Sequence, residues 1–134
     1  MNTTTRERIT YLPPVEWQSG PFQAEEEDGI AEALRLTYDP DPKVRAHAVN
    51  DLCPCRLKTD YPEVWDRLLT MTSDESPTVR SHVLHVLADG SPRHREPQVV
   101  GAIESMHDDP DPKLRRRVRK LLAHYRRGGR INIL

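Results

Sequence analysis

The residues best suited to chemistry are two cysteines in the segment Cys53-Pro54-Cys55. Thiolates at this spacing can bind a soft metal ion or close a small disulfide. A structural zinc site needs four ligands, however, and the chain has neither a second cysteine pair nor histidines at zinc-finger spacing. Cys53 can instead pack in the core as a small apolar side chain. The pattern favours a core cysteine and leaves metal or redox chemistry open.

Two histidines, His82 and His85, lie three residues apart in a segment with helical apolar spacing. No serine, cysteine or carboxylate accompanies them in a nucleophile motif, which covalent catalysis would require. They are better explained as polar surface or as contacts between neighbouring structural units. We therefore predict no catalytic residue, no bound cofactor and no metal ligand, and a protein that is not an enzyme.

A cluster of basic residues occupies the end of the chain. Between Lys113 and Leu134 there are nine basic residues and no acidic one, whereas residues 1–40 hold three basic and eight acidic residues. The net charge of −1 therefore conceals a strongly uneven distribution. Basic residues clustered on a helix are typical of phosphate binding. They also occur on the solvated face and at the C-terminal end of an ordinary helix.

The elements that must position these residues follow from an internal repeat. Asp39–Arg45, Asp74–Arg80 and Asp109–Arg115 are three copies of one pattern, and their shared proline recurs every 35 residues, at 42, 77 and 112. A period of this length is typical of helical solenoids. In each copy a polar residue (Asp41, Ser76 or Asp111) precedes the proline. This arrangement predicts a capped helix start.

Apolar residues at helical spacing predict two helices in each repeat, an A helix before the turn and a B helix after it. The A-helix positions are Ile30, Ala33 and Leu36, then Trp65, Leu68 and Met71, then Val100, Ile103 and Met106. The B-helix positions are Val44, Ala48 and Leu52, then Val79, Val83 and Leu87, then Leu114, Val118 and Leu122. Pro62 and Pro97 mark the starts of the second and third A helices.

The pattern Asp-x-x-Pro-x-(Val/Leu)-Arg resembles the HEAT-repeat family, in particular the short HEAT-like repeats of the phycobilin-lyase type. The resemblance covers roughly residues 25–126. It implies a ladder in which the aspartates and arginines of the pattern bond the turns and B helices of neighbouring repeats. It is specific for fold and unspecific for activity, because the family consists mostly of binding scaffolds.

The expected fold is an all-α, right-handed α-solenoid of three HEAT-like repeats with an extended N-terminal arm. We assign residues 1–23 to the arm, 24–58, 59–93 and 94–127 to the repeats, and 128–134 to a C-terminal tail. The arm either caps repeat 1 or contacts a partner. The acidic run 25–28 is expected at the start of the first A helix. A cytoplasmic location is expected, since neither a secretory signal nor a long apolar run is present.

The expected binding surface is the concave face formed by the B helices, which in solenoids is the usual place for a ligand. Its ten candidate binding residues are Lys43, Asn50, Ser81, His85, Lys113, Arg116 and Lys120, flanked by His47, His82 and Arg117. Ala46 and Thr78 are expected on the same face. The leading hypothesis is a non-catalytic scaffold that binds a protein partner on this face. The alternatives are nucleic-acid binding through the basic third repeat and, third, a lyase-like or metal-dependent activity involving Cys53 and Cys55.

Overall fold

The computed structural model describes residues 21–53, 61–89 and 91–128, and the side chains from residue 28 onward. This part of the chain holds six α-helices and no strand. They are α2 (Pro21–Leu36), α3 (Pro42–Asp51), α5 (Pro62–Thr70), α6 (Pro77–Ala88), α7 (Glu96–Glu104) and α8 (Pro112–Arg126). Two short 3-10 helices, η2 (Met71–Ser73) and η3 (Arg93–Arg95), follow α5 and precede α7.

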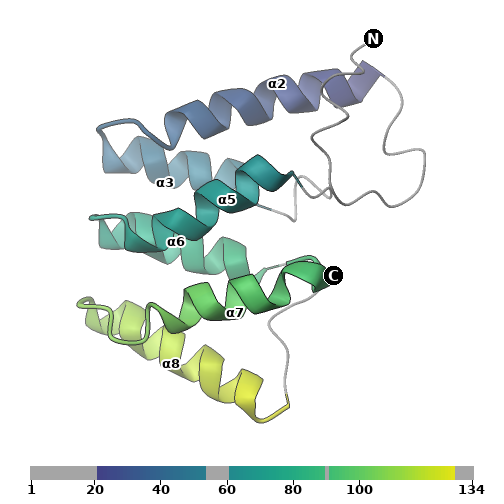
Figure 1. Cartoon of the computed structure of the whole chain (residues 1–134). Coiled ribbons are helices and arrows are strands. Elements are labelled where there is room, and N and C mark those ends of the chain that lie inside the picture. The colour runs from purple at the N-terminus through teal and green to yellow at the C-terminus, as the bar shows by residue number, and fades with distance from the viewer. Residues whose placement is uncertain (1–20, 54–60, 90, 129–134) are drawn as a thin grey trace.

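The helices form a stack of three antiparallel pairs (Figure 1). The A helices are α2, α5 and α7, and the B helices are α3, α6 and α8. The turn within each pair lies at the same edge of the stack (Figure 1). The 35-residue period therefore corresponds to one helical pair, and the prediction of an all-α solenoid of three repeats is confirmed.

Each B helix begins as its sequence predicts. The side chains of Asp41 and Asp111 accept hydrogen bonds from backbone N–H groups in the first turn of α3 and α8, both at 2.9 Å. Ser76 caps α6 in the same way at 3.4 Å. A proline follows each cap, at a position where no backbone donor is needed. The three B helices thus share one start signal.

The first A helix differs from expectation. It begins at Pro21, so the acidic run 25–28 lies in its second turn and not at its start. The helix dipole acts mainly within the first turn, and therefore gives no reason for this run. The remainder of the predicted arm, residues 1–20, and Cys55 lie outside the described residues, as does the tail from residue 129.

Most of the predicted apolar positions are buried between the helical pairs. Trp65 in α5 is 3% exposed, which confirms it as a core residue. Leu36, Val44 and Val100 are only partly buried. Leu36 and Val44 belong to repeat 1, which has a described neighbouring repeat on one side only. In α7 the adjacent Val99 is fully buried and takes the inward position expected for Val100.

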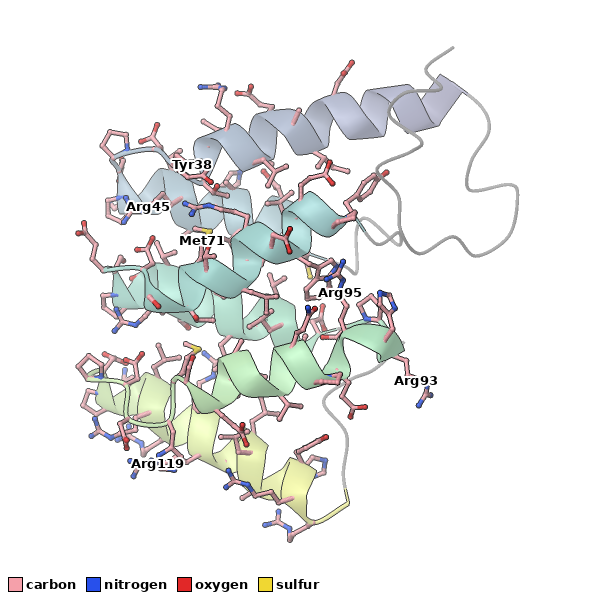
Figure 2. All side chains as sticks on the ribbon, viewed as in Figure 1. Tyr38, Arg45, Met71, Arg93, Arg95 and Arg119 are labelled. Atoms are coloured by element: carbon pink, nitrogen blue, oxygen red, sulfur yellow. The ribbon has the colours of Figure 1, made fainter. Side chains whose placement is uncertain are left out.

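The arginines of the repeat form the predicted ladder between repeats. Arg45 donates through Nε and Nη2 to both carboxylate oxygens of Asp74, each at 3.0 Å. Arg80 binds Asp109 in the same bidentate manner, at 2.8 and 2.9 Å. Figure 2 shows Arg45 at the edge of the stack where the turns lie. Each arginine therefore joins its own B helix to the turn of the next repeat.

The guanidinium and carboxylate groups of the repeat pattern also bond to the backbone of the turns. Nη1 of Arg45, Arg80 and Arg115 donates to the carbonyl of the aspartate six residues earlier, at 2.7–2.8 Å. Asp74 and Asp109 each accept a backbone N–H two residues ahead, both at 2.9 Å. Burial alone would raise the pKa of these two carboxyls. The hydrogen bonds from arginine and backbone outweigh it, so the pKa of each lies below its ordinary value.

A second link joins repeats 1 and 2 and does not follow from the repeat pattern. Arg67 in α5 donates through Nε to the hydroxyl of Thr37 at 2.9 Å and through Nη2 to its carbonyl at 2.8 Å. Its guanidinium group lies 3.7 Å from the ring centroid of Tyr38, at cation–π distance. The first turn is therefore held by Arg67 from α5 of repeat 2 and by Arg45 from α3 of its own repeat.

Val83→Asp is expected to unfold the whole stack, because Val83 is fully buried in the middle repeat. An unpaired buried charge costs several kcal/mol, a large share of the roughly 5–15 kcal/mol that stabilises a small domain. Val79→Asp should act in the same way. Circular dichroism measures the outcome, with Thr78→Asp at an exposed neighbouring position as the control. Wild-type helicity in the two valine variants would contradict the stacking.

Arg80→Ala should lower the free energy of unfolding by about 3–5 kcal/mol, because it leaves the carboxylate of Asp109 buried without its partner. Arg115→Ala is the matched control: within the described part of the chain Arg115 makes only the bond to its own turn, so the loss should be about 1 kcal/mol. Urea unfolding of both variants measures the difference. Equal losses would show that the bonds between repeats contribute nothing beyond the turn bond.

Acid should destabilise the stack through the same carboxyls. Because the folded-state pKa of Asp74 and Asp109 is lowered, their stabilisation is complete above the unfolded-state value of about 3.9 and is lost as the pH falls through the folded value. The melting temperature of the wild type should therefore drop steeply below about pH 4. In the double variant Asp74→Asn, Asp109→Asn the melting temperature should be lower at neutral pH and should fall less as the pH is lowered. An equal fall of the melting temperature in the wild type and the variant would contradict this assignment.

Candidate functional site

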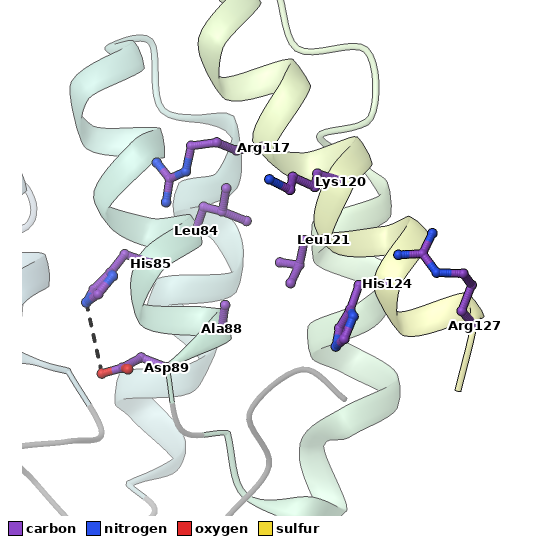
Figure 3. A pocket seen from close by; sticks show the side chains of 9 residues that line it. All are labelled: Leu84, His85, Ala88, Asp89, Arg117, Lys120, Leu121, His124 and Arg127. Atoms are coloured by element: carbon purple, nitrogen blue, oxygen red, sulfur yellow. Dashed lines mark ion pairs between the residues drawn. The ribbon is translucent and has the colours of Figure 1, made fainter. Parts of the chain in front are cut away.

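A groove of about 480 Å³ lies between the B helices of the second and third repeats (Figure 3). It is open to solvent along the C-terminal halves of α6 and α8. Nine residues line it: Leu84, His85, Ala88 and Asp89 from α6 and its C-terminal cap, and Arg117, Lys120, Leu121, His124 and Arg127 from α8 and its C-terminal cap.

The groove exists because the B helices do not pack equally. α3 packs extensively against α6, whereas α8 contacts α6 sparsely. The repeat-equivalent residues Ala46, Ser81 and Arg116 follow this difference, since they are buried, half-buried and exposed in that order. The prediction that Ala46 lies on the open face was wrong. The helix that carries it, α3, packs closely against its neighbours, and this small side chain is buried there. The wider gap between B helices thus lies between repeats 2 and 3.

The floor of the groove is apolar. Leu84 is 2% exposed at its base, and Ala88 and Leu121 are partly buried on its two sides. An apolar floor of this kind can accept aliphatic side chains from a ligand.

The α8 side of the groove is cationic. Lys113, Arg117, Lys120, His124 and Arg127 recur at intervals of three or four residues, which places them along one face of the helix. All five are exposed. Only one acidic residue, Asp89, lines the groove. We call these five residues, four of them permanent cations and one a histidine, the α8 cationic stripe.

The remaining basic residues of α8 are mostly used internally. Arg119 donates to Asp108 and to the carbonyl of His107, and Arg126 forms an ion pair with Glu104 at 3.7 Å. Arg115 belongs to the ladder described above. In contrast, Lys113, Lys120 and Arg127 of the stripe make no ion pair within the described residues, and Arg116 beside them makes none either. The cationic surface is therefore smaller than the nine basic residues of the sequence suggest, and it is aligned with the groove.

The stripe is unfavourable for the helix that carries it. Lys113 lies in the first turn of α8, at the positive end of the helix dipole. Lys113 with Arg117, and Arg116 with Lys120, are like charges four residues apart, a spacing that destabilises an isolated helix. Stabilisation of the helix C-terminus by cations explains only Arg126 and Arg127. Lys113, Arg116 and Lys120 lie outside the last turn and make no ion pair within the described residues, so neither effect explains them.

The structure brings six of the ten predicted binding residues together. His85, Arg117 and Lys120 line the groove, while Asn50, Ser81 and His82 line an adjoining hollow that shares His85 and Arg117 with it. Arg117 donates to the hydroxyl of Ser81 at 2.8 Å. The other four are exposed but lie outside both cavities: Lys43, His47, Lys113 and Arg116.

Sequence reasoning missed the floor and the far end of the groove. Leu84, Ala88 and Leu121 follow no polar signal and look like ordinary core positions. His124 and Arg127 continue the stripe at helical spacing, so the periodicity of the basic residues could have found them. The position of Asp89 depends on how α6 ends and could not have been found in this way.

The two histidines of α6 make separate contacts. Nδ1 of His82 lies 2.8 Å from the carbonyl of Thr78 in its own helix. His85 instead points toward Asp89, with Nε2 and Oδ2 4.0 Å apart (Figure 3). The same carboxylate oxygen lies 3.3 Å from the Sγ of Cys53, which is 4% exposed at the end of α3. Cys53 is therefore buried, as expected, and it lies beside a polar group of the next repeat.

Within the described residues, no helix is both long enough and apolar enough to span a membrane. The predicted cytoplasmic location stays a prediction.

Comparison with known proteins agrees with the architecture. A family model described as HEAT repeats matches residues 28–123, which is most of the chain. Neither the curated proteins nor the solved structures contain a significant match. The phycobilin-lyase subtype stays a prediction, because the match is to the family as a whole. The stacked helical pairs, the bonded turns and this match together show that the chain belongs to the HEAT-repeat family.

Proposed function

We propose that the protein is a non-catalytic scaffold that binds an acidic, partly apolar segment of a protein partner in the groove between α6 and α8. The observation that carries this proposal is the combination of an apolar floor with the α8 cationic stripe. HEAT repeats generally serve as interaction scaffolds, and repeat proteins typically bind their ligands on such extended faces. The groove narrows the expected binding surface to repeats 2 and 3.

The charges of the groove favour an acidic partner. The stripe lowers the stability of α8, and a bound segment rich in Asp and Glu would relieve the repulsion between its cations. The aliphatic stems of Lys120 and Arg127 can cover apolar side chains of the partner while their charged ends meet carboxylates. An amphipathic helix is one form of ligand that presents both kinds of side chain to a groove.

Nucleic-acid binding is the second candidate, and the α8 cationic stripe supports it. Cations at helical spacing can follow a phosphate backbone. Single-stranded nucleic acid is commonly bound with bases stacked on aromatic side chains. The nine residues that line the groove include no Trp, Tyr or Phe. The apolar floor would then have no role, and for this reason we favour the protein partner.

Charge reversal in the groove should reduce binding of an acidic amphipathic probe. The probe is a fluorescein-labelled helical peptide with Glu on one face and Leu on the other, and its scrambled form is the ligand control. Lys120→Glu with Arg127→Glu should weaken binding at least about tenfold, since each lost charge contact contributes roughly 0.5–1 kcal/mol or more. The control Lys43→Glu with Arg93→Glu makes the same charge change at exposed positions outside the groove. Fluorescence anisotropy measures the binding of both peptides to the wild type and to the two double variants.

Equal loss in both double variants, or equal binding of the scrambled peptide, would contradict the groove as the protein-binding site. A labelled single-stranded oligonucleotide and a duplex are tested alongside. Binding to phosphates weakens steeply with salt. If either nucleic acid binds more tightly than the peptide at near-physiological salt, and the groove variant loses that binding, the second candidate replaces the first.

A further inference from the structure

Three side chains with metal-binding atoms meet where repeat 1 joins repeat 2. They are Cys53 at the end of α3, and His85 and Asp89 at the end of α6. Sγ, an imidazole nitrogen and a carboxylate oxygen of these residues all lie within 4.8 Å of one another. We propose that Cys53, His85 and Asp89 form a binding site for a zinc ion that links the first two repeats.

The distances are close to those that zinc requires. Zinc bonds of about 2.0–2.3 Å in a tetrahedral arrangement place the donor atoms roughly 3.3–3.6 Å apart. The Sγ of Cys53 is 3.3 Å from Oδ2 of Asp89, within this range. Nε2 of His85 is 4.0 Å from the same oxygen. The imidazole nitrogen and Sγ lie within 4.8 Å of each other. The side chain of His85 is 58% exposed, and it must move toward the other two ligands for one zinc ion to bind all three.

The ligand types also select the metal. One thiolate, one imidazole and one carboxylate are a set that suits zinc, whereas magnesium and calcium are bound through oxygen ligands. Three protein ligands leave the fourth position of a tetrahedral site open, and a water molecule would fill it. Binding converts the thiol of Cys53 to a thiolate and releases its proton to solvent.

The site differs from the one that the Cys53-Pro54-Cys55 spacing suggests. The helical spacing of His85 and Asp89 at i and i+4 places both on one face of α6, toward Cys53. The ligands therefore come from two repeats that are 32 to 36 residues apart in sequence. The ion would bind only when α3 and α6 are packed together, and would stabilise that packing.

Cobalt(II), a spectroscopic substitute for zinc, tests the site directly. The chain has two cysteines, so the Cys55→Ser variant contains Cys53 as its single thiol. With one equivalent of cobalt this variant should show the thiolate-to-cobalt absorption band and the visible bands of a tetrahedral ion. Zinc should displace the cobalt. Cys53→Ser should abolish the thiolate band.

His85 and Asp89 are more exposed than Cys53. Their substitution therefore tests metal binding without disturbing the core. His85→Ala and Asp89→Asn should each weaken cobalt affinity at least about tenfold, because each removes a direct ligand and direct ligands matter at least as much as the groups that orient them. His82→Ala, one turn earlier on α6, is the matched control and should bind cobalt like the parent. Circular dichroism without metal verifies that each variant is folded.

Zinc should also raise the melting temperature of the parent protein, by about 5–10 °C at a hundredfold excess over its dissociation constant, and should not raise that of His85→Ala. Loss of the thiolate band in Cys55→Ser, unchanged affinity in His85→Ala, or equal loss in His82→Ala would each overturn the site. None of these measurements involves a partner, so a failure of the metal site can be distinguished from a failure of the proposed function, although His85 and Asp89 also line the groove.

Discussion

The structure depends on the burial of apolar side chains between repeats that are too thin to bury them alone. A single helical pair has one apolar side for each neighbour, so Val83 or Leu122 is covered only when the adjacent pair is in place. The folding stability of the protein therefore depends on the interfaces between neighbouring repeats. The ladder of Arg45, Asp74, Arg80 and Asp109 fixes how the pairs are aligned, because each bidentate bond has a narrow geometry.

Much of this architecture follows from the sequence because it is encoded locally and repeated. The cap and proline at the start of each B helix fix where a helix begins, and the helical spacing of apolar residues fixes which side is buried. Both signals occur three times, so an error in one copy is corrected by the others. The start of α2 at Pro21 was missed because this proline is out of register with Pro62 and Pro97, whose equivalent in the first repeat is Glu27.

The candidate site could be predicted only in part. The B-helix face and its cations follow from helical spacing, and six of the ten predicted residues do border the two cavities. The groove itself depends on how far α8 lies from α6, and spacing along one helix carries no information about the distance between two. The same limit applies to Ala46, which the packing of α3 covers, and to the meeting of Cys53 with Asp89. In both cases the deciding contact is between repeats.

The position of the ladder has a mechanical consequence. Arg80 and Asp109 join repeats 2 and 3 at the edge where the turns lie, whereas the groove opens toward the opposite ends of α6 and α8. Strong polar bonds at one edge and sparse packing between the two B helices mean that repeats 2 and 3 are held firmly at their turns and less firmly along the groove. A ligand that occupies the groove would add contacts where this junction has fewest, and would therefore stabilise the packing of the third repeat as well as bind to it.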